Sequence, residues 1–116
     1  MKQTIFYLFL LISLINITSC KKLEKTGDFI VNARDGAGTS LNGETVYLYN
    51  NQADYNNKIY SKTKVADNSG QVKFENLVPG VYYVDCDFVN QLSQTITIWG
   101  SGSVSAGYET TITIKP

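Results

Sequence analysis

Short runs of alternating apolar and polar residues, separated by turn-forming residues, fill the chain from Gly27 onward. Apolar residues at every second position turn one face of a strand toward a core and the other toward solvent. No stretch keeps the spacing of an amphipathic helix over about ten residues. Seven runs are found, at 28–33, 45–50, 58–66, 71–75, 81–89, 94–99 and 108–115. They predict an all-β fold, a seven-stranded antiparallel Greek-key β-sandwich.

The alternation also assigns faces and connections. Segment 81–89 directs four side chains into the core, namely Tyr82, Val84, Cys86 and Phe88. In segment 58–66, the same rule places Val65 on the inward side. Segment 51–57 is rich in Asn and Gln and is expected to be a polar loop. The sequence DNSG at 67–70 is expected to be a hairpin turn, because Asp caps local amides and Gly accepts a positive φ.

Composition excludes several classes of protein. The chain has 116 residues, 10 basic and 10 acidic side chains, no histidine and 2 cysteines. This length suits one small domain, and a hydrophobic content of 43% argues against disorder. Balanced charge gives no reason to expect a nucleic-acid partner, and two cysteines rule out a disulfide-rich scaffold.

An apolar stretch near the start of the chain follows a positive charge. Lys2 precedes the run from Ile5 to Ile17, which only Ser13 and Asn16 interrupt. As a helix this run would rise about 20 Å, well short of the ~30 Å hydrocarbon layer of a bilayer. We therefore expect a cleaved signal peptide rather than a membrane-spanning helix.

The end of this stretch differs from the A-x-A pattern of ordinary secretory cleavage. The sequence Ile17-Thr18-Ser19-Cys20 resembles the lipobox of bacterial lipoprotein precursors: one aliphatic residue, two small residues and a cysteine. The resemblance implies that Cys20 receives a diacylglycerol, that cleavage occurs just before it, and that its new amine is acylated. Two or three acyl chains anchor a protein firmly, because each buried methylene contributes about 0.8 kcal/mol.

The residues behind Cys20 bear on which membrane holds the protein. Lys21 stands where inner-membrane lipoproteins of enteric bacteria carry an aspartate, so the resemblance favours the outer membrane. Surface lipoproteins of the Bacteroidetes, the group to which the resemblance points, often carry an acidic cluster here. This chain has KKLEK instead, so a periplasmic or a surface orientation stays open. The expected organisation is a signal peptide at 1–19, a lipidated cysteine and tether at 20–26, and one domain at 27–116.

Two motifs in the domain resemble a known family. GETVYLY at 43–49 and DNSGQVKFENLVPGVYYV at 67–84 are similar to prealbumin-like modules of bacterial surface proteins. These modules include carboxypeptidase regulatory-like and Cna protein B-type domains. The matching positions are Gly43, Val46, Leu48, Asp67, Gly70, Phe74, Leu77, Pro79, Gly80 and Tyr82. The resemblance implies a prealbumin-like sandwich but no activity, since such modules serve as spacers, stalks and accessory domains.

One chemical property of that family can be checked residue by residue. Many Cna protein B-type domains form an internal Lys–Asn isopeptide bond with the help of a buried acid. Alignment on the shared motifs puts Ala33 at the position of the lysine and Cys86 at the position of the acid. Alanine has no amine and a thiol is a poor proton donor, so we do not expect this bond.

Segment 81–89 contains two further candidate sites. Asp85 and Asp87 share one strand face about 6–7 Å apart and could hold Ca²⁺ with loop carbonyls, although a solvated strand face is favoured. Cys86 lies between them. A small buried hydrophobe is favoured over a nucleophile, since the chain has no histidine to lower the thiol pKa. The same interpretation is favoured over a disulfide between Cys86 and Cys20, because lipidation would occupy the sulfur of Cys20.

Aromatic side chains gather on the predicted outer face. Tyr47, Tyr49, Tyr60 and Tyr83 are expected to point away from the core. Cross-strand aromatic pairs that cover the sheet would explain them. They are also the candidate ligand-binding residues of a flat platform for a glycan or a peptide. Trp99 is expected to plug one end of the sandwich.

These patterns together predict a non-enzymatic lipoprotein whose sandwich serves as a structural or protein-interaction module in the bacterial envelope. Its expected partners are the membrane, through the lipid, and an envelope protein. The alternative is a carbohydrate- or peptide-binding lipoprotein that uses the four tyrosines. No catalytic residue, metal ligand or cofactor is expected apart from the covalent lipid on Cys20.

Overall fold

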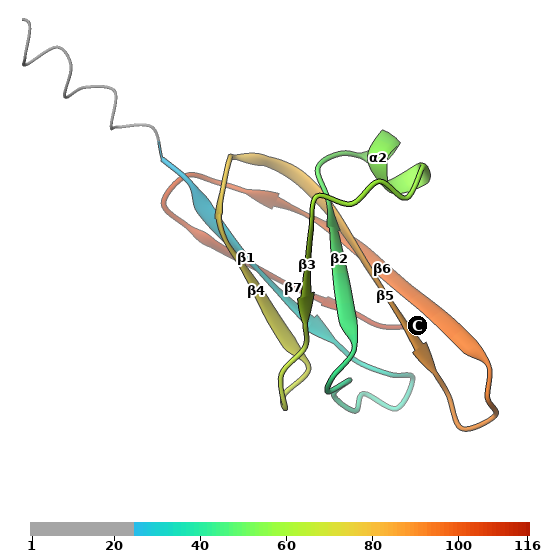
Figure 1. Cartoon of the computed structure of the whole chain (residues 1–116). Coiled ribbons are helices and arrows are strands. Elements are labelled where there is room, and N and C mark those ends of the chain that lie inside the picture. Colours follow the sequence, from blue (N-terminus) through green and yellow to red (C-terminus); the bar gives the residue numbers. More distant parts are fainter. Residues whose placement is uncertain (1–24) are drawn as a thin grey trace, which may run out of the picture.

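The computed structural model describes residues 25–116, so the predicted signal peptide and Cys20 lie outside the described part of the chain. Figure 1 shows the order of the elements. They are β1 (Gly27–Ala33), β2 (Thr45–Tyr49), α2 (Gln52–Asn56), β3 (Lys62–Val65), β4 (Gln71–Leu77), β5 (Gly80–Val89), β6 (Thr95–Val104) and β7 (Glu109–Ile114). Within this part, no helix has the length and apolar character needed to cross a membrane.

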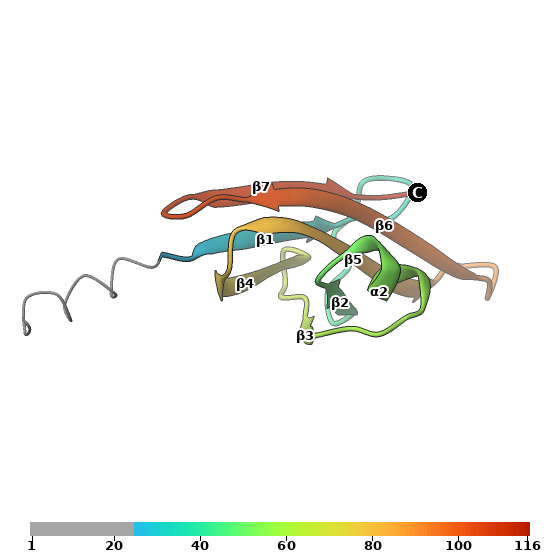
Figure 2. The ribbon, with the colours of Figure 1, turned by 90° about the horizontal axis from the view of Figure 1, so that it is seen from above.

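The seven predicted strands form two sheets. One sheet has the order β4-β1-β7 and the other the order β3-β2-β5-β6. Segment 50–61, which includes α2, lies on the outer face of the four-stranded sheet. Figure 2 shows α2 on the side of the molecule opposite to β7. The all-β, two-sheet architecture is confirmed.

The core lies between the two sheets and takes every second residue of the central strands. β1 alternates buried and half-buried positions, with Phe29, Val31 and Ala33 fully enclosed. In β5 the four side chains predicted to face inward are all buried. Period-two alternation predicts these faces correctly because each central strand has one face on the core and one toward solvent.

The prediction of antiparallel pairing throughout is wrong for one pair. β1 and β7 run parallel, with Asp28–Ala33 opposite Glu109–Ile114. A tight turn dictates antiparallel pairing only for the two strands that it joins. β1 and β7 are the first and last strands, so no turn fixes their relative direction.

The run at 58–66 also differs from its prediction. Only Lys62–Val65 forms a strand, β3, and all four of its residues are exposed, including Val65. β3 is the edge of its sheet and pairs with β2 alone, so one side of its backbone is unpaired, and the opposite sheet does not enclose its side chains. The polar loop expected at 51–57 contains the one-turn helix α2 instead.

β6 continues past Trp99 through the Gly/Ser-rich segment as far as Val104. Gly100 and Gly102 leave room for the opposite sheet. A Cβ atom on Gly102 would lie 2.7 Å from Cε1 of Phe29, and one on Gly100 would lie 2.7 Å from Cγ2 of Ile114. Glycine in a strand often marks such close approach.

A turn at DNSG is confirmed, but the hairpin is wrong, because β3 and β4 belong to different sheets and the turn carries the chain from one sheet to the other. Oδ1 of Asp67 accepts hydrogen bonds from the backbone N–H groups of Ser69 and Gln71, at 2.9 and 3.0 Å. Gly70 has a φ of 74°, and a Cβ there would lie 2.7 Å from the Ala33 carbonyl oxygen. These contacts fix the β3–β4 turn against the start of the β1–β2 loop.

Candidate functional site

Segment 50–61 folds over the outer face of the four-stranded sheet and brings side chains to it. α2 begins after Asn51, whose Oδ1 accepts a hydrogen bond from the Asp54 N–H at 2.8 Å. The segment leaves the helix at Lys58, which has a φ of 58°. A left-handed conformation costs a residue other than glycine about 1–2 kcal/mol. Surrounding contacts therefore hold Lys58 in place.

Tyr55 of α2 is the centre of an aromatic cluster. Its ring meets Tyr49 of β2 edge-to-face, with centroids 5.2 Å apart, and stacks on Tyr83 of β5 at 5.9 Å. Trp99 of β6 lies 5.9 Å from the same ring. Each aromatic pair contributes about 0.5–1.5 kcal/mol beyond area burial. The cluster thus joins α2 to three neighbouring strands of the sheet, β2, β5 and β6.

A second aromatic pair borders this cluster. The rings of Tyr47 in β2 and Tyr60, which follows α2, meet at 64° with centroids 5.0 Å apart. Tyr60 is more than half exposed, and its neighbour Ile59 is equally open. The far end of the face is marked by Trp99, also more than half exposed.

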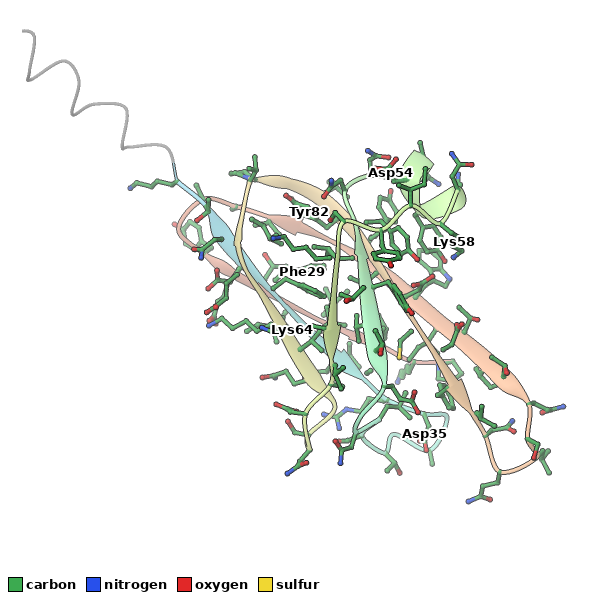
Figure 3. All side chains as sticks on the ribbon, viewed as in Figure 1. Phe29, Asp35, Asp54, Lys58, Lys64 and Tyr82 are labelled. Carbon is green, nitrogen blue, oxygen red and sulfur yellow. The ribbon has the colours of Figure 1, made fainter. Side chains whose placement is uncertain are left out.

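A charged pair lies at the centre of the face. Asp85 of β5 is only 6% exposed and is the single buried charged residue between 25 and 116. Its Oδ1 accepts a hydrogen bond from the Tyr49 hydroxyl at 3.1 Å, and its Oδ2 accepts one from Nζ of Lys58 at 2.8 Å. The ammonium also sits 4.1 Å from the centroid of the Tyr55 ring. In Figure 3 Lys58 lies below α2, beside the aromatic rings.

This geometry raises the pKa of the two groups that donate to Asp85. The hydrogen bond to Asp85 raises the pKa of Lys58, so the amine stays protonated. Burial, and then the charge of Asp85, raise the pKa of Tyr49, so its phenol stays a donor. The three groups therefore form a satisfied polar network that fixes segment 50–61 to the sheet.

A shallow cleft of about 350 Å³ opens beside this network. It is lined by Tyr47, Tyr49, Lys58, Tyr60, Asp85, Asp87 and Thr97. Oδ1 of Asp87 accepts a hydrogen bond from the Thr97 hydroxyl at 2.7 Å. The cleft offers aromatic walls, one amine and two carboxylates, which suits recognition of a polar group with an apolar face.

The four predicted tyrosines do lie on one outer face, but they are not equally accessible. Tyr49 is buried under Tyr55, Tyr47 and Tyr83 are half-buried, and only Tyr60 is largely exposed. Their role in ligand binding stays a prediction.

Two contributors to this face were not predicted from the sequence, and a third was misplaced. Tyr55 and Lys58 reach the sheet only because segment 50–61 folds over it. The available signal in the sequence was the pair Asn51 and Asp54, which marks the start of a helix. Trp99 is not an end plug, because it lies on the outward face of β6 against Tyr55.

Asp85 and Asp87 are not arranged as a calcium cage. Lys58 and Tyr49 already occupy the oxygens of Asp85, and Thr97 binds Asp87. Calcium takes six to eight oxygen ligands around one point. Among residues 25–116, no three His, Cys, Asp or Glu side chains gather closely enough to hold a metal ion.

Cys86 is fully buried on the core face of β5 as a free thiol. Burial raises its pKa to about 12. A thiol that stays protonated is neither a nucleophile nor a metal ligand at neutral pH. This agrees with the interpretation of Cys86 as a packing residue.

No protein-family model matches the chain, and no curated protein matches it. Solved structures do match in fold. The minor pilin GBS52 of Streptococcus agalactiae superposes with a TM-score of 0.55 at 17% identity, over 78% of this chain and 44% of the pilin. BcpA, the major pilin subunit of Bacillus cereus, gives 0.53 at 18% identity, over 78% and 29%.

A proposed carbohydrate-binding protein of Pseudomonas aeruginosa, PA1324, is also similar. It superposes with a TM-score of 0.54 at 14% identity, over 79% of this chain and 89% of that protein. The chain therefore spans less than half of each pilin and most of the Pseudomonas protein. Identities this low show a shared pilin-like β-sandwich fold and nothing finer.

Proposed function

We propose that the chain is a bacterial outer-membrane lipoprotein that displays a non-catalytic, prealbumin-like Greek-key sandwich as a protein-interaction module. A signal peptide at 1–19 is removed, and Cys20 carries the lipid. Residues 20–26 form the tether, and the sandwich from residue 27 onward contacts another envelope protein.

The observation that carries this proposal is the outer face of the four-stranded sheet. Protein interfaces are enriched in tyrosine and tryptophan. Here Ile59, Tyr60 and Trp99 stand more than half exposed above a rigid layer fixed by the Lys58–Asp85 pair. We call the surface made by Ile59, Tyr60 and Trp99, with the cleft beside it, the aromatic face.

The lipid anchor is tested by growing cells with a fatty-acid analogue that can be tagged. The wild-type chain is expected to take up label, and Cys20→Ala is expected to take up none. Cys86 provides an internal control, because Cys86→Ala leaves the lipobox intact and should label like the wild type. No label on the wild type, or equal label on Cys20→Ala, contradicts the anchor.

The interaction is tested with a photo-crosslinking amino acid placed at Tyr60, with Thr111 as the control position. Thr111 is exposed on β7, in the other sheet. The expected result is a defined crosslinked band from position 60 alone, which Trp99→Ala weakens. The same bands from both positions, or no effect of Trp99→Ala, would contradict an interaction through the aromatic face.

A second candidate function is carbohydrate binding at the same face. It is favoured by the cleft, in which Asp87 and Thr97 lie beside tyrosine rings, of which that of Tyr60 is exposed. This arrangement suits the polar edge and apolar face of a sugar. The fold is also that of PA1324. Retention on immobilised envelope glycans that Asp87→Ala abolishes, with the unfolding midpoint unchanged, would select this function over the first, because Asp87 is exposed and lines the cleft.

A further inference from the structure

The end of the sandwich at which the described chain begins carries an apolar rim. Three exposed apolar side chains lie there: Tyr108 is 71% exposed, Val78 is 64% exposed and Val81 is 52% exposed. Tyr108 belongs to the β6–β7 turn, and the two valines flank the β4–β5 turn. Neither 76–81 nor 103–108 contains a charged residue. We call these three side chains the apolar rim.

Backbone contacts place both turns around the start of β1. The Gly107 N–H donates to the Thr26 carbonyl at 2.9 Å, and the Asp28 N–H donates to the Tyr108 carbonyl at 3.0 Å. On the other side, Gly27 of β1 lies opposite Leu77 at the end of β4. In Figure 1 the β6–β7 turn and the β4–β5 turn lie at the end where β1 begins, and the β5–β6 hairpin lies at the other end.

The rim is held rigidly. The Tyr82 hydroxyl donates a hydrogen bond to the Val78 carbonyl at 2.6 Å, which ties the β4–β5 turn to the core. Gly107 has a φ of 82°, and the Tyr108 N–H donates to the Ser105 carbonyl at 3.2 Å, which closes the β6–β7 turn. Apolar side chains are therefore exposed on turns with fixed backbones.

The short connection to Cys20 limits where this end can be. Thr26 follows Cys20 by six positions, with five residues (21–25) between them. A fully extended chain of that length reaches only about 20 Å. If Cys20 is lipidated, as proposed above, the apolar rim cannot leave the neighbourhood of the bilayer.

The charge of the connection favours closer approach. Residues 21–25 contain three lysines and one glutamate. Basic residues next to an anchor are attracted to anionic headgroups. Tyrosine is favoured at the interface between headgroups and acyl chains, where its ring is buried and its hydroxyl stays wet.

We propose that the apolar rim rests on the lipid surface, so that the sandwich stands on the membrane end-on rather than swinging freely on its tether. This inference rests on the lipid anchor of the proposed function. The ten residues of β5 rise about 33 Å away from the rim. The β5–β6 hairpin is then the part held farthest from the bilayer, and the aromatic face is turned sideways.

The test uses the mature lipidated chain in vesicles of phosphatidylethanolamine and phosphatidylglycerol. A fluorophore is attached at Ser105→Cys, in the β6–β7 turn, or at Gln91→Cys, in the β5–β6 hairpin. Both positions are exposed, and Cys86 is buried, so the added thiol is the one modified. Lipids with a spin label on the headgroup should quench the fluorophore at 105 severalfold more strongly than the fluorophore at 91.

The rim itself is tested with Val78→Thr, Val81→Thr and Tyr108→Ser combined. Threonine keeps the β-branched shape, and all three positions are exposed, so the core is not disturbed. Quenching at 105 should fall toward the value at 91. Val89→Thr with Leu92→Ser removes equally exposed apolar residues at the other end and should change nothing.

The outcomes separate the two proposals. If mass analysis shows no lipid on Cys20, both the anchor and the membrane contact are overturned. If the chain carries lipid and sediments with vesicles, but the two fluorophores are quenched equally, only the membrane contact is overturned. Rim substitutions that leave quenching at 105 unchanged would overturn the membrane contact as well, and would leave the anchor standing.

Discussion

Replacing Lys58 with methionine tests whether the polar network holds segment 50–61 on the sheet. Methionine keeps the unbranched, four-atom stem of lysine and removes its charged amine. Asp85, 6% exposed, then retains the Tyr49 hydroxyl as its one hydrogen-bond donor among the side chains described. The ammonium–Tyr55 contact at 4.1 Å is lost at the same time.

The expected loss follows from the burial of each partner. Breaking a fully buried ion pair costs about 3–5 kcal/mol, and breaking a surface pair costs about 0–1 kcal/mol. The side chain of Lys58 is 57% exposed and that of Asp85 is 8% exposed, so water reaches one side of the pair. We therefore expect Lys58→Met to lower the free energy of unfolding by about 2 kcal/mol, including up to ~1 kcal/mol for the cation–π contact.

The assay is urea unfolding followed by fluorescence of Trp99, the single tryptophan of the chain, with circular dichroism as a second probe. Lys62→Met is the matched control, because Lys62 lies on the exposed strand β3. It should change stability by less than about 0.5 kcal/mol. The double variant Lys58→Met/Asp85→Asn leaves no buried charge unpaired, so the two single effects should not add.

The pH dependence has a definite sign. Because Asp85 raises the folded-state pKa of Lys58, the pair contributes fully below pH 10.5, the ordinary value of lysine, and its contribution is lost as pH rises above it. The difference between the wild type and Lys58→Met should thus be constant from pH 6 to 9 and shrink in more alkaline buffer. Equal stability of Lys58→Met and Lys62→Met, or additive effects in the double variant, would refute the network.

Four further outcomes are expected. Because burial raises the pKa of Cys86 to about 12 from 9.0, its thiol should be unreactive to a disulfide reagent at pH 8 until urea is added. The free energy of unfolding should also fall as pH rises above 9, because the thiol then ionises in the unfolded state but not in the folded state. Cys86→Val should reduce this pH dependence. Gly102→Ala should lower the free energy of unfolding by about 1–3 kcal/mol, since its Cβ would lie 2.7 Å from Phe29, whereas Ser101→Ala, on the exposed side of β6, should change it by less than about 0.5 kcal/mol. Tyr82→Phe should cost about 1 kcal/mol in a urea titration, because the β4–β5 turn loses the hydroxyl donor to its carbonyl.

Local alternation predicted the strands whose environment is uniform along their length. β5 is the clearest case, because one face meets the core throughout and side-chain direction depends only on position in the strand. The prediction failed at β3 and for the direction of β7 beside β1. Enclosure of an edge strand and pairing of distant strands depend on the whole assembly, and no nearby residue signals them.

The sequence predicted mainly the part of the candidate site that lies on strands. Tyr47, Tyr49 and Tyr83 were placed on the outer face by alternation, and they lie there on β2 and β5. Tyr60 was also placed there, and it reaches the face from the segment before β3. The burial of Asp85 was not foreseen, because Lys58 reaches it from a loop 27 residues earlier in the chain. A buried outward-facing carboxylate requires a cover, and alternation within β5 contains no information about that cover.

The parallel pairing of β1 and β7 has a mechanical consequence. Tension applied at the start of β1 and at the end of β7 pulls the two strands in opposite directions along their length. All the hydrogen bonds between Asp28–Ala33 and Glu109–Ile114 are then loaded together in shear, rather than opened one by one as in a peeled hairpin. A domain joined in this way transmits force between its two ends through its most enclosed strand, and it extends only when the whole ladder yields at once.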